Sequence, residues 1–335
     1  MTACSGSADR AVRGGGPLVT IAMAVYEPDL AWLREQLLSL EGQSYPALEL
    51  IVLDDGSKGL SEGLLRTVVQ SCVRSFPAKV YKREQNRGSN ATFEELTALA
   101  SGKYIAYCDQ DDVWLPEKIA ALVSAAEESG APLVCSDMYV IDGRGNVVAD
   151  SITKVRRHHR FLSGEGLTAS LFCKNFVTGC TMLVRAEQAR AALPFCPFMV
   201  HDHWLALFCS ARGAIVTLPQ PLIRYRIHSR NQTLVLAGVN DKASYTAVRV
   251  QKLCDRLAWL QEHFDCPDGA RAALAEMRAW AEARLHNMRG EKGWRKAVWQ
   301  GRRFGFLPSL FEQFAPRLPK PLFSLAVKLV QKNRI

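Results

Sequence analysis

Three carboxylates directly after a short apolar run are the strongest chemical feature of this sequence. The run is Tyr104–Cys108, and Asp109, Asp111 and Asp112 follow it. In an extended segment the side chains of Asp109 and Asp111 project from the same side, so both reach one ligand. Like charges at this spacing repel each other unless a cation lies between them, and carboxylate oxygens favour Mg²⁺ or Mn²⁺. We therefore predict a divalent-metal site at Asp109 and Asp111, with a solvated acidic turn that caps a helix as the open alternative.

A predicted strand precedes the acidic turn and a predicted helix follows it. Tyr104–Cys108 is almost wholly apolar, which is typical of a strand buried on both faces. Pro116 suits the first turn of a helix, with Ile119, Leu122 and Val123 on its buried side. The carboxyl end of such a strand faces the ligand crevice of an open α/β sheet. We expect the three carboxylates to lie outside the core.

Earlier strands end in polar turns of the same kind. The predicted strands are Leu18–Val25, Leu48–Leu53 and Lys79–Tyr81, and helical patterns alternate with them. This alternation predicts an α/β fold with a doubly wound, mostly parallel sheet flanked by helices. The strand ends then gather along one crevice, as a nucleotide site requires. The turns that follow these strands are Tyr26-Glu27-Pro28, Asp54-Asp55-Gly56-Ser57 and Asn86-Arg87-Gly88-Ser89-Asn90.

A hairpin makes the predicted sheet mixed. Pro132–Tyr139 reads as a strand, and the tight-turn residues 142–146 lead into Val147 and Val148. Residues 151–161 are then basic and irregular. This segment is either a mobile loop over the crevice or a solvated loop without function.

The acidic turn resembles a known family. Asp109-Gln110-Asp111-Asp112, followed by Trp114, Pro116 and Lys118, resembles the DxD segment of the inverting family 2 glycosyltransferases of GT-A fold, especially their rhamnosyltransferase-like branch. The resemblance covers about residues 19–233. It implies a GT-A fold and a nucleotide-sugar donor whose diphosphate is bound through Mn²⁺ or Mg²⁺.

The resemblance also implies donor contacts at the earlier strand ends. By position, Tyr26, Glu27 and Asp55 become contacts to the base and ribose, and Asp109 contacts the donor as well as the metal. Asp55 accepts hydrogen bonds of the kind a pyrimidine or ribose donates, although an Asx turn is the open alternative. Arg87 suits phosphate by its geometry, against the alternative of an ordinary surface arginine.

A second acidic position is the predicted catalytic base. His201-Asp202-His203-Trp204 opens an apolar helix, and a carboxylate of tuned pKa is a plausible general base for a sugar hydroxyl. Helix N-capping is the alternative that the residues leave open. The resemblance implies that Asp202 is the base, since family members keep such an aspartate before a Trp-containing helix. A single in-line displacement then inverts the anomeric centre.

A basic strand completes the predicted site. Along Leu222–Ile227 and the residues after it, basic side chains alternate and so share one face. The stretch resembles the Tyr-Arg-x-His segment of the same branch. It implies that Arg226 contacts the donor and that His228 contacts metal or phosphate, with a structural histidine as the alternative. The alternating residues are Arg224, Arg226, His228 and Arg230.

The composition of the chain indicates the compartment in which we expect the protein. The 335 residues are 48% hydrophobic and 22% charged, as in an ordinary globular protein, and no apolar run reaches membrane-spanning length. Residues 1–16 lack the apolar core of a secretory signal, so we read them as a flexible leader and expect a cytoplasmic protein. The ten cysteines contain no C-x-x-C pair, which favours buried thiols over a zinc site.

The net charge of +9 comes from the C-terminal tail. Residues 288–335 contain eleven Lys and Arg against Glu291 and Glu312, and aromatic and aliphatic residues alternate with them. This composition predicts an interfacial region that binds an anionic membrane surface at the inner face of the plasma membrane. Extra core over the catalytic domain is the alternative. The tail has no identifiable nucleic-acid motif, so we expect no nucleic acid partner.

These observations combine into one functional prediction. Residues 17–235 form the GT-A domain, with a nucleotide-binding half at about 17–115 and an acceptor half at about 116–235, and 236–335 form a basic helical region. The predicted reaction moves rhamnose from dTDP-rhamnose, with inversion, onto a glycan or lipid-linked saccharide in cell-surface polysaccharide synthesis. The alternatives are a sugar-nucleotidyltransferase and a non-catalytic binder of nucleotide or nucleic acid. The glycines 14–16 precede the first strand, which counts against a nucleotidyltransferase.

Overall fold

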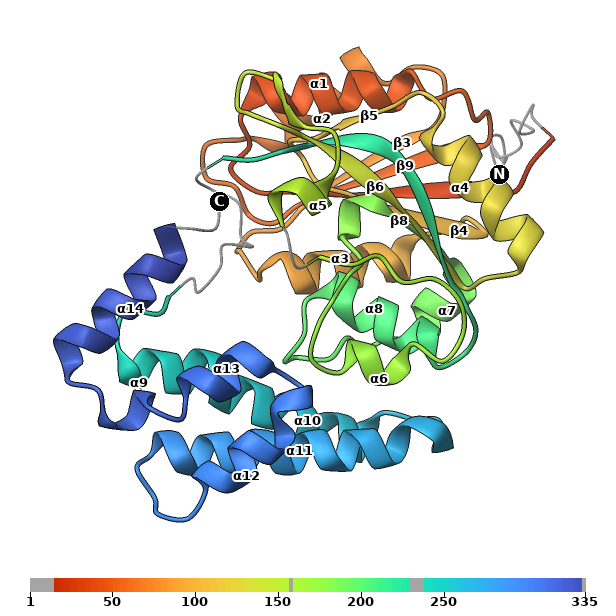
Figure 1. Cartoon of the computed structure of the whole chain (residues 1–335). Helices are drawn as coiled ribbons and strands as arrows, with labels where there is room; N and C mark the ends of the chain where they lie inside the picture. The colour runs from red at the N-terminus through yellow and green to blue at the C-terminus, as the bar shows by residue number, and fades with distance from the viewer. Residues whose placement is uncertain (1–14, 157–158, 229–237, 333–335) are drawn as a thin grey trace, which may run out of the picture.

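The computed structural model describes residues 15–156, 159–228 and 238–332. A twisted mixed sheet lies between helices on its two faces, and the helices after residue 238 form a second lobe beside it (Figure 1). The predicted leader falls almost wholly outside the described residues, as do Arg230 and residues 157–158 of the basic loop.

The first half of the sheet is parallel, as predicted. Its strands occur in the order β3-β2-β1-β4. Every residue of β2 and of β4 is buried, which matches their apolar sequences. The strands are β1 (Val19–Val25), β2 (Leu48–Asp54), β3 (Ala78–Lys82) and β4 (Tyr104–Cys108), and the helices between them are α1 (Leu30–Glu41), α2 (Glu62–Cys72) and α3 (Ser89–Leu99).

The second half of the sheet reverses direction next to β4. Strand β8 (Met182–Arg185) pairs antiparallel with β4 and with β6 (Leu133–Ile141). Strand β9 (Ile215–Arg226) runs parallel to β6, and β7 (Val147–Ala149) closes the predicted hairpin. The antiparallel start of β8 therefore lies beside the carboxyl end of β4, where the acidic turn begins.

Two boundaries differ from the prediction. The acidic turn leads first into a two-residue strand, β5 (Val113–Trp114), which pairs antiparallel with β9. Helix α4 (Lys118–Ser129) then begins after Pro116, not around it. Strand β9 also begins well before Leu222, because its prolines are accommodated by shifts in register against β6.

Short helical segments carry the chain from β7 to β9. The basic loop begins with a helical turn, α5 (Ile152–Val155), and the 3₁₀ turn η1 (Gly179–Thr181) leads into β8. The remaining segments are α6 (Thr168–Leu171), α7 (Ala186–Ala191) and α8 (His201–Ser210).

The C-terminal helices share a core with the sheet domain. Trp204 of α8 contacts Trp259 and Phe264 at ring-centroid distances of 5.4 and 5.8 Å. Of the tail aromatics, Phe323 is buried in this common core, whereas Phe306 and Phe314 are more than half exposed. The alternative that the tail adds to the core of the catalytic domain therefore applies to part of the tail only. The elements are α9 (Lys242–Tyr245), the π-helical turn η2 (Thr246–Gln251), α10 (Lys252–His263), α11 (Asp268–Met288), α12 (Arg295–Gln300), η3 (Gly301–Arg303), α13 (Phe306–Phe311), η4 (Ala315–Arg317) and α14 (Lys320–Lys332).

A buried ion pair holds the second lobe together. The carboxylate of Glu312 accepts hydrogen bonds from Arg284 and from the hydroxyl of Tyr245, at 2.7 and 2.8 Å.

Across the described parts of the chain, none of the helices combines the length and apolarity needed to cross a bilayer. The nine cysteines described are free thiols, and all but the half-buried Cys173 are buried, as predicted.

Candidate active site

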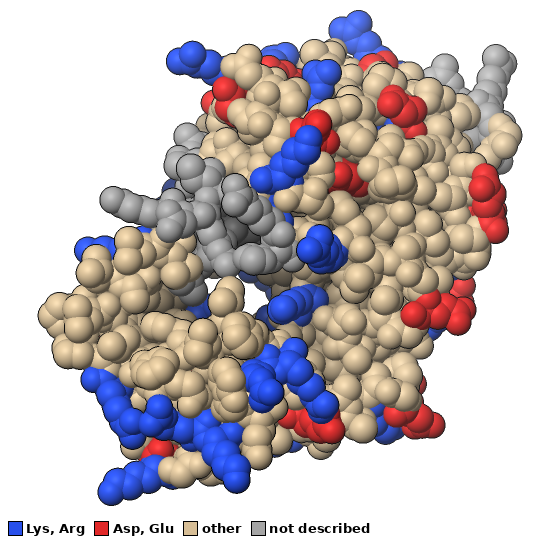
Figure 2. Space-filling view, viewed as in Figure 1, with Lys and Arg blue, Asp and Glu red and all other residues tan. Residues whose placement is uncertain are grey.

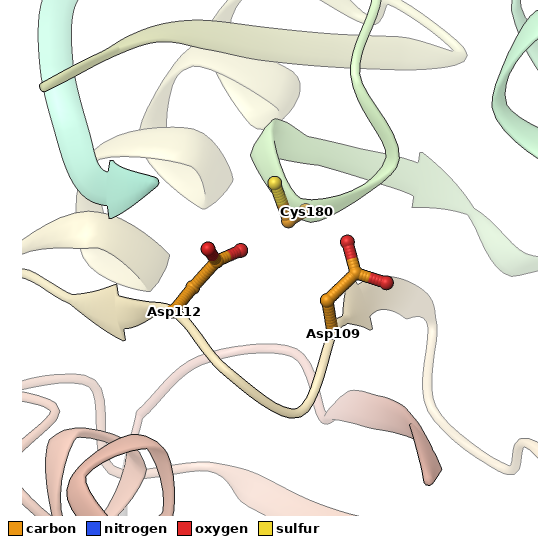
Figure 3. A group of neighbouring side chains, drawn as sticks. All are labelled: Asp109, Asp112 and Cys180. Carbon is orange, nitrogen blue, oxygen red and sulfur yellow. The ribbon is translucent and has the colours of Figure 1, made fainter. Parts of the chain in front are cut away.

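The acidic turn brings two aspartates together beside a cysteine. Asp109 and Asp112 come from the turn between β4 and β5, and Cys180 comes from η1 (Figure 3). One potential ligand atom from each of the three lies within 4.8 Å of the other two. Burial raises the pKa of Asp109 to about 7, and the carboxylates of Asp111 and Asp202 add to this effect. The site therefore crowds carboxyl groups at the end of β4, and this crowding disfavours the ionised form of Asp109.

Asp112 contradicts the expectation that all three carboxylates lie outside the core. It is fully buried, and its carboxylate accepts the backbone N–H of Arg226 at 2.9 Å. Burial, together with Asp111 and Asp109, raises its pKa well above the ordinary value. Asp112 therefore fixes the turn to the end of β9 and was missed as a site residue.

A buried lysine lies under the turn. The ammonium of Lys118 donates to the carbonyl of Cys180 at 2.5 Å and lies 3.2 Å from the ring centroid of Trp114. Burial lowers its pKa to about 7, and the neighbouring Asp112 and Asp109 oppose that effect. The sequence signal that could have predicted a buried lysine beside the turn is the position of Lys118 in the same motif as the three carboxylates.

The predicted metal ligands fall into two groups. The Nε2 atom of His228 lies 2.7 Å from Oδ2 of Asp111, and the His228 ring lies 4.9 Å from that of Trp32. The chain bends at residues 110–111, so Asp109 and Asp111 do not share one side as an extended segment would have it. Asp111 meets His228, whereas Asp109 meets Asp112 and Cys180.

The acidic turn is tied to the end of β1. The side-chain amide of Gln110 accepts from the N–H of Tyr26 at 2.8 Å and donates to its carbonyl at 3.0 Å. Glu27 adopts φ 42°, an unusual value for a residue other than glycine, and its carboxylate accepts the N–H of Lys58 at 2.7 Å. The Tyr26 side chain is exposed beside the turn.

Asp55 is buried at the next strand end. It accepts hydrogen bonds from the guanidinium of Arg83 and from the N–H groups of Arg87 and Gly88, at 2.9, 3.0 and 2.8 Å. The turn hydrogen bond from the N–H of Ser57 goes to Asp54 instead, so the Asx-turn alternative applies to that residue.

Two arginines complete this strand end. Arg83 was missed because it meets Asp55 only through the pairing of β2 with β3. The side chain of Arg87 is exposed beside it.

Asp202 lies in the first turn of α8 but is not its N-cap. The N-cap position is Val200, and the carboxylate of Asp202 accepts from the N–H of Gly179 and the amide of Asn175, both at 3.1 Å. Burial raises its pKa to about 6, while the backbone N–H of Gly179 and the charge of Arg156 act to lower it. The N-capping alternative is therefore wrong.

The flanking histidines are core residues. His201 stacks on Phe93 at 3.9 Å, and Nε2 of His203 lies 2.6 Å from the carbonyl of Leu171. Burial lowers both pKa values to about 3, so both rings are neutral at pH 7. The raised pKa of Asp202 therefore comes from its own burial and not from charged neighbours.

One short turn connects the two acidic groups. The backbone N–H of Gly179 donates to Asp202, and the thiol of the next residue, Cys180, lies within 4.8 Å of carboxylate oxygens of Asp109 and Asp112. A side chain at position 179 would place its Cβ 2.5 Å from Nε2 of His201, so only glycine fits. The sequence showed a glycine in this loop but not that it links the two sites.

Arg226 supports the acidic turn through a hydrogen bond to its backbone. Its side chain is buried, its Nε donates to the carbonyl of Asp111 at 2.8 Å, and it forms an ion pair with Glu35 at 2.5 Å. This position gives Arg226 a clear role in holding Asp111, and its contact with a donor stays a prediction.

Comparison with known proteins adds a family and a fold. The family model for glycosyl transferase family 2 matches residues 20–186. An uncharacterized glycosyltransferase of Nostoc sp. is 26% identical over 216 residues, which are 63% of this chain and 65% of the relative. Another, from Methanocaldococcus jannaschii, is 30% identical over 40% of this chain and 46% of its own length. The matched segment thus spans less than two thirds of these two relatives.

Solved structures share the fold at low identity. A mannosyltransferase from Pyrobaculum calidifontis, in complex with GDP-Man and Mn²⁺, has a TM-score of 0.55 at 17% identity, covering 95% of this chain and 80% of that one. S. aureus TarS in complex with UDP-GlcNAc has a TM-score of 0.57 at 14% identity, with 95% and 89% covered. The predicted fold, a mixed α/β sheet of GT-A type with C-terminal helices, is confirmed.

Proposed function

Because residues 20–186 form a glycosyl transferase family 2 domain, we propose that this chain transfers a sugar from a nucleotide diphosphate donor to an acceptor hydroxyl. The observation that carries the proposal is the turn η1, which holds Asp202 through Gly179 and contacts the acidic turn through Cys180. A base and a cluster of carboxylates at one strand end are what such a transfer requires. The nucleotide-binding half at about 17–115 and the acceptor half at about 116–235 are part of the proposal.

The donor nucleoside is proposed to bind where the first two strands end. Tyr26 is exposed there, and Asp55 lies beside the exposed side chain of Arg87. Glu27 is fixed by hydrogen bonds to Ser57 and Lys58 in the turn after β2, so its position is set before a ligand binds. Tyr26, Glu27, Asp55 and Arg87 are therefore the proposed donor contacts, with Asp109 and Arg226 at the diphosphate end.

The proposed cation ligands are Asp109, Asp111 and His228. Asp111 and His228 already meet, and carboxylate oxygens with one imidazole suit Mn²⁺ or Mg²⁺. The pKa of the Cys180 thiol is raised well above its usual value by burial and by Asp112 and Asp109, so the thiol stays protonated and is a poor ligand for a hard cation. A bound cation would hold the donor diphosphate and offset the charge that develops on it.

Asp202 is proposed as the general base. With a pKa of about 6 it is mostly ionised at pH 7, yet basic enough to accept the proton of an acceptor hydroxyl. The acceptor oxygen then bonds to the anomeric carbon as the bond from that carbon to the diphosphate breaks. One such displacement inverts the anomeric centre and releases the nucleoside diphosphate.

Rhamnose from dTDP-rhamnose is the first donor that we propose, because the acidic turn resembles the rhamnosyltransferase-like branch. The structural neighbours carry GDP-Man and UDP-GlcNAc, so these donors belong in the same test. The proposed acceptor is a glycan or lipid-linked saccharide of cell-surface polysaccharide synthesis. We place the enzyme in the cytoplasm, at the inner face of the membrane.

A donor panel tests the proposed function. The full chain is incubated with Mn²⁺ and each of dTDP-rhamnose, GDP-mannose and UDP-GlcNAc, and release of nucleoside diphosphate is measured with and without chelator. We expect release from one donor, dependent on metal and lost in Asp109→Asn. If no donor is turned over or bound by the folded protein, the proposal is wrong.

A further inference from the structure

Helix α14 is apolar on two opposite sides. Its inner side carries Phe323 and Val327, which are buried, and the Phe323 ring lies 5.4 Å from Phe311 and 5.8 Å from Tyr245. Ser324 and Gln331 fix this side further through hydrogen bonds to the backbone of residues 239–240. Within the described residues, the helix is therefore held in the fold through this inner side.

The outer side of α14 is an exposed apolar stripe. Leu322, Leu325 and Leu329 recur at spacings of three and four residues and are 53, 54 and 54% exposed. A surface helix ordinarily carries polar residues at such positions. Phe306 of α13 and Phe314 after it are exposed as well, so the same lobe carries further exposed aromatic side chains. Exposed apolar surface of this kind marks an interaction site.

The charged residues of α14 and of the segment just before it are all basic. After Glu312 the sequence contains no acidic residue, whereas Arg317, Lys320 and Lys328 are exposed. Lys328 comes three residues after Leu325 on α14, so the two are neighbours on the helix surface and Lys328 flanks the stripe. Figure 2 shows the C-terminal lobe, at the lower left, as a largely uncharged surface edged below by Lys and Arg.

We propose that the outer stripe of α14 docks on an anionic lipid membrane. Apolar side chains edged by basic ones match the boundary between acyl chains and anionic headgroups. The helix has 13 residues, about 20 Å of length, so it is too short to span a bilayer core of about 30 Å and would lie in the interface. A second copy of this chain fits less well, because two basic surfaces would face each other.

This inference goes beyond the transfer reaction, since it concerns where the protein is held. The test is flotation of the full chain with vesicles of phosphatidylcholine alone, or mixed with phosphatidylglycerol, at low salt. The variant Leu325→Ser/Leu329→Ser changes only the outer stripe, and Lys328→Glu changes only its charge. Leu38→Ser is the matched control, because Leu38 is a leucine of α1 that is 57% exposed.

We expect the wild type and Leu38→Ser to float with the anionic vesicles and not with the neutral ones. The double serine variant and Lys328→Glu should each bind about tenfold or more weakly, with thermal unfolding and metal-dependent donor release unchanged. No flotation of the wild type, or equal flotation of the double variant, would overturn the inference. A concentration-dependent dimer that the double variant loses, without vesicle binding, would assign the stripe to a second copy instead. Donor release is read separately, so its failure would count against the proposed reaction and not against the membrane surface.

Discussion

Replacing Asp202 with asparagine tests the proposed catalytic base, because it removes proton acceptance and keeps the shape of the side chain. Asparagine keeps the shape and one of the acceptor oxygens but cannot take a proton. We expect turnover to fall by about two to four orders of magnitude, while nucleotide affinity stays near that of the wild type, since the base meets the acceptor and not the diphosphate. In the wild type, kcat/KM should rise with pH through about 6 and then level off, because the pKa of Asp202 is raised to about 6.

The same substitution should change stability with a sign that depends on pH. The folded-state pKa of Asp202, about 6, lies above its ordinary value of 3.8, so the folded protein holds this proton more tightly than the unfolded chain. The stabilisation from the bound proton is complete below pH 3.8 and is lost as the pH rises through about 6. This difference corresponds to at most about 3 kcal/mol, and the solvent that reaches the half-buried carboxylate reduces it to about 2 kcal/mol.

Asparagine at position 202 never ionises, so it avoids that loss. Asparagine also has one acceptor oxygen fewer than aspartate for the N–H of Gly179 and the amide of Asn175. This loss lowers the free energy of unfolding by about 1 kcal/mol. The variant should therefore be more stable than the wild type by about 1 kcal/mol at pH 7.5 and less stable by about 1 kcal/mol below pH 4. Each of these differences corresponds to a change in Tm of about 2 °C.

Thermal unfolding across pH 4 to 8, with chelator present, measures this reversal. The control is Asp268→Asn, because Asp268 also lies in the first turn of a helix, α11, but its side chain is 98% exposed. The control should show no reversal of sign. An Asp202→Asn variant that keeps its turnover and is destabilised equally at both ends of the pH range would refute the assignment of a catalytic base.

Three further substitutions address the acidic turn and its supports. Asp111→Asn should weaken Mn²⁺-dependent nucleotide binding, and calorimetry that finds equal affinity in the variant, or with chelator present, would remove the metal from the mechanism. Lys118→Met should lower the free energy of unfolding by about 1–3 kcal/mol, since it leaves the buried carbonyl of Cys180 without its donor, and denaturant unfolding at the wild-type midpoint would contradict this. Gly179→Ala should cost about 1–3 kcal/mol and most of the turnover, because its Cβ would lie 2.5 Å from His201; an active, equally stable alanine variant would show that the turn relaxes freely.

The fold was largely predictable because its elements are regular. The apolar runs of β1, β2 and β4 and the alternating helices fixed the parallel half, and the turn at residues 142–146 fixed the hairpin. Strand β5 was missed because two residues show no periodicity, and its formation depends on pairing with β9. The start of β9 was missed because Pro219 and Pro221 argue against a strand unless register shifts accommodate them.

The site was predictable where the signal is local. Aspartates after a buried strand and before an apolar helix led to Asp109, Asp111 and Asp202. Their directions were not predictable, because the bend at residues 110–111 turns Asp111 to His228 and leaves Asp112 facing inward. Contacts such as Arg83 with Asp55 depend on strand pairing that joins distant parts of the chain.

The reversal of strand direction at β8 is what makes the site. Because β8 runs antiparallel to β4, with Leu183 opposite Ala106, the start of β8 lies at the edge of the sheet where β4 ends. The turn η1 precedes that start and therefore reaches the acidic turn, and its Gly179 holds Asp202 at the same place. A parallel β8 would have put η1 at the opposite edge of the sheet, away from the acidic turn. A fragment that ends before η1 would lose Cys180 beside the acidic turn together with Asp202. Truncation would therefore disturb the acidic turn and remove Asp202 at once, whereas substitution at Asp202 changes the proposed base alone.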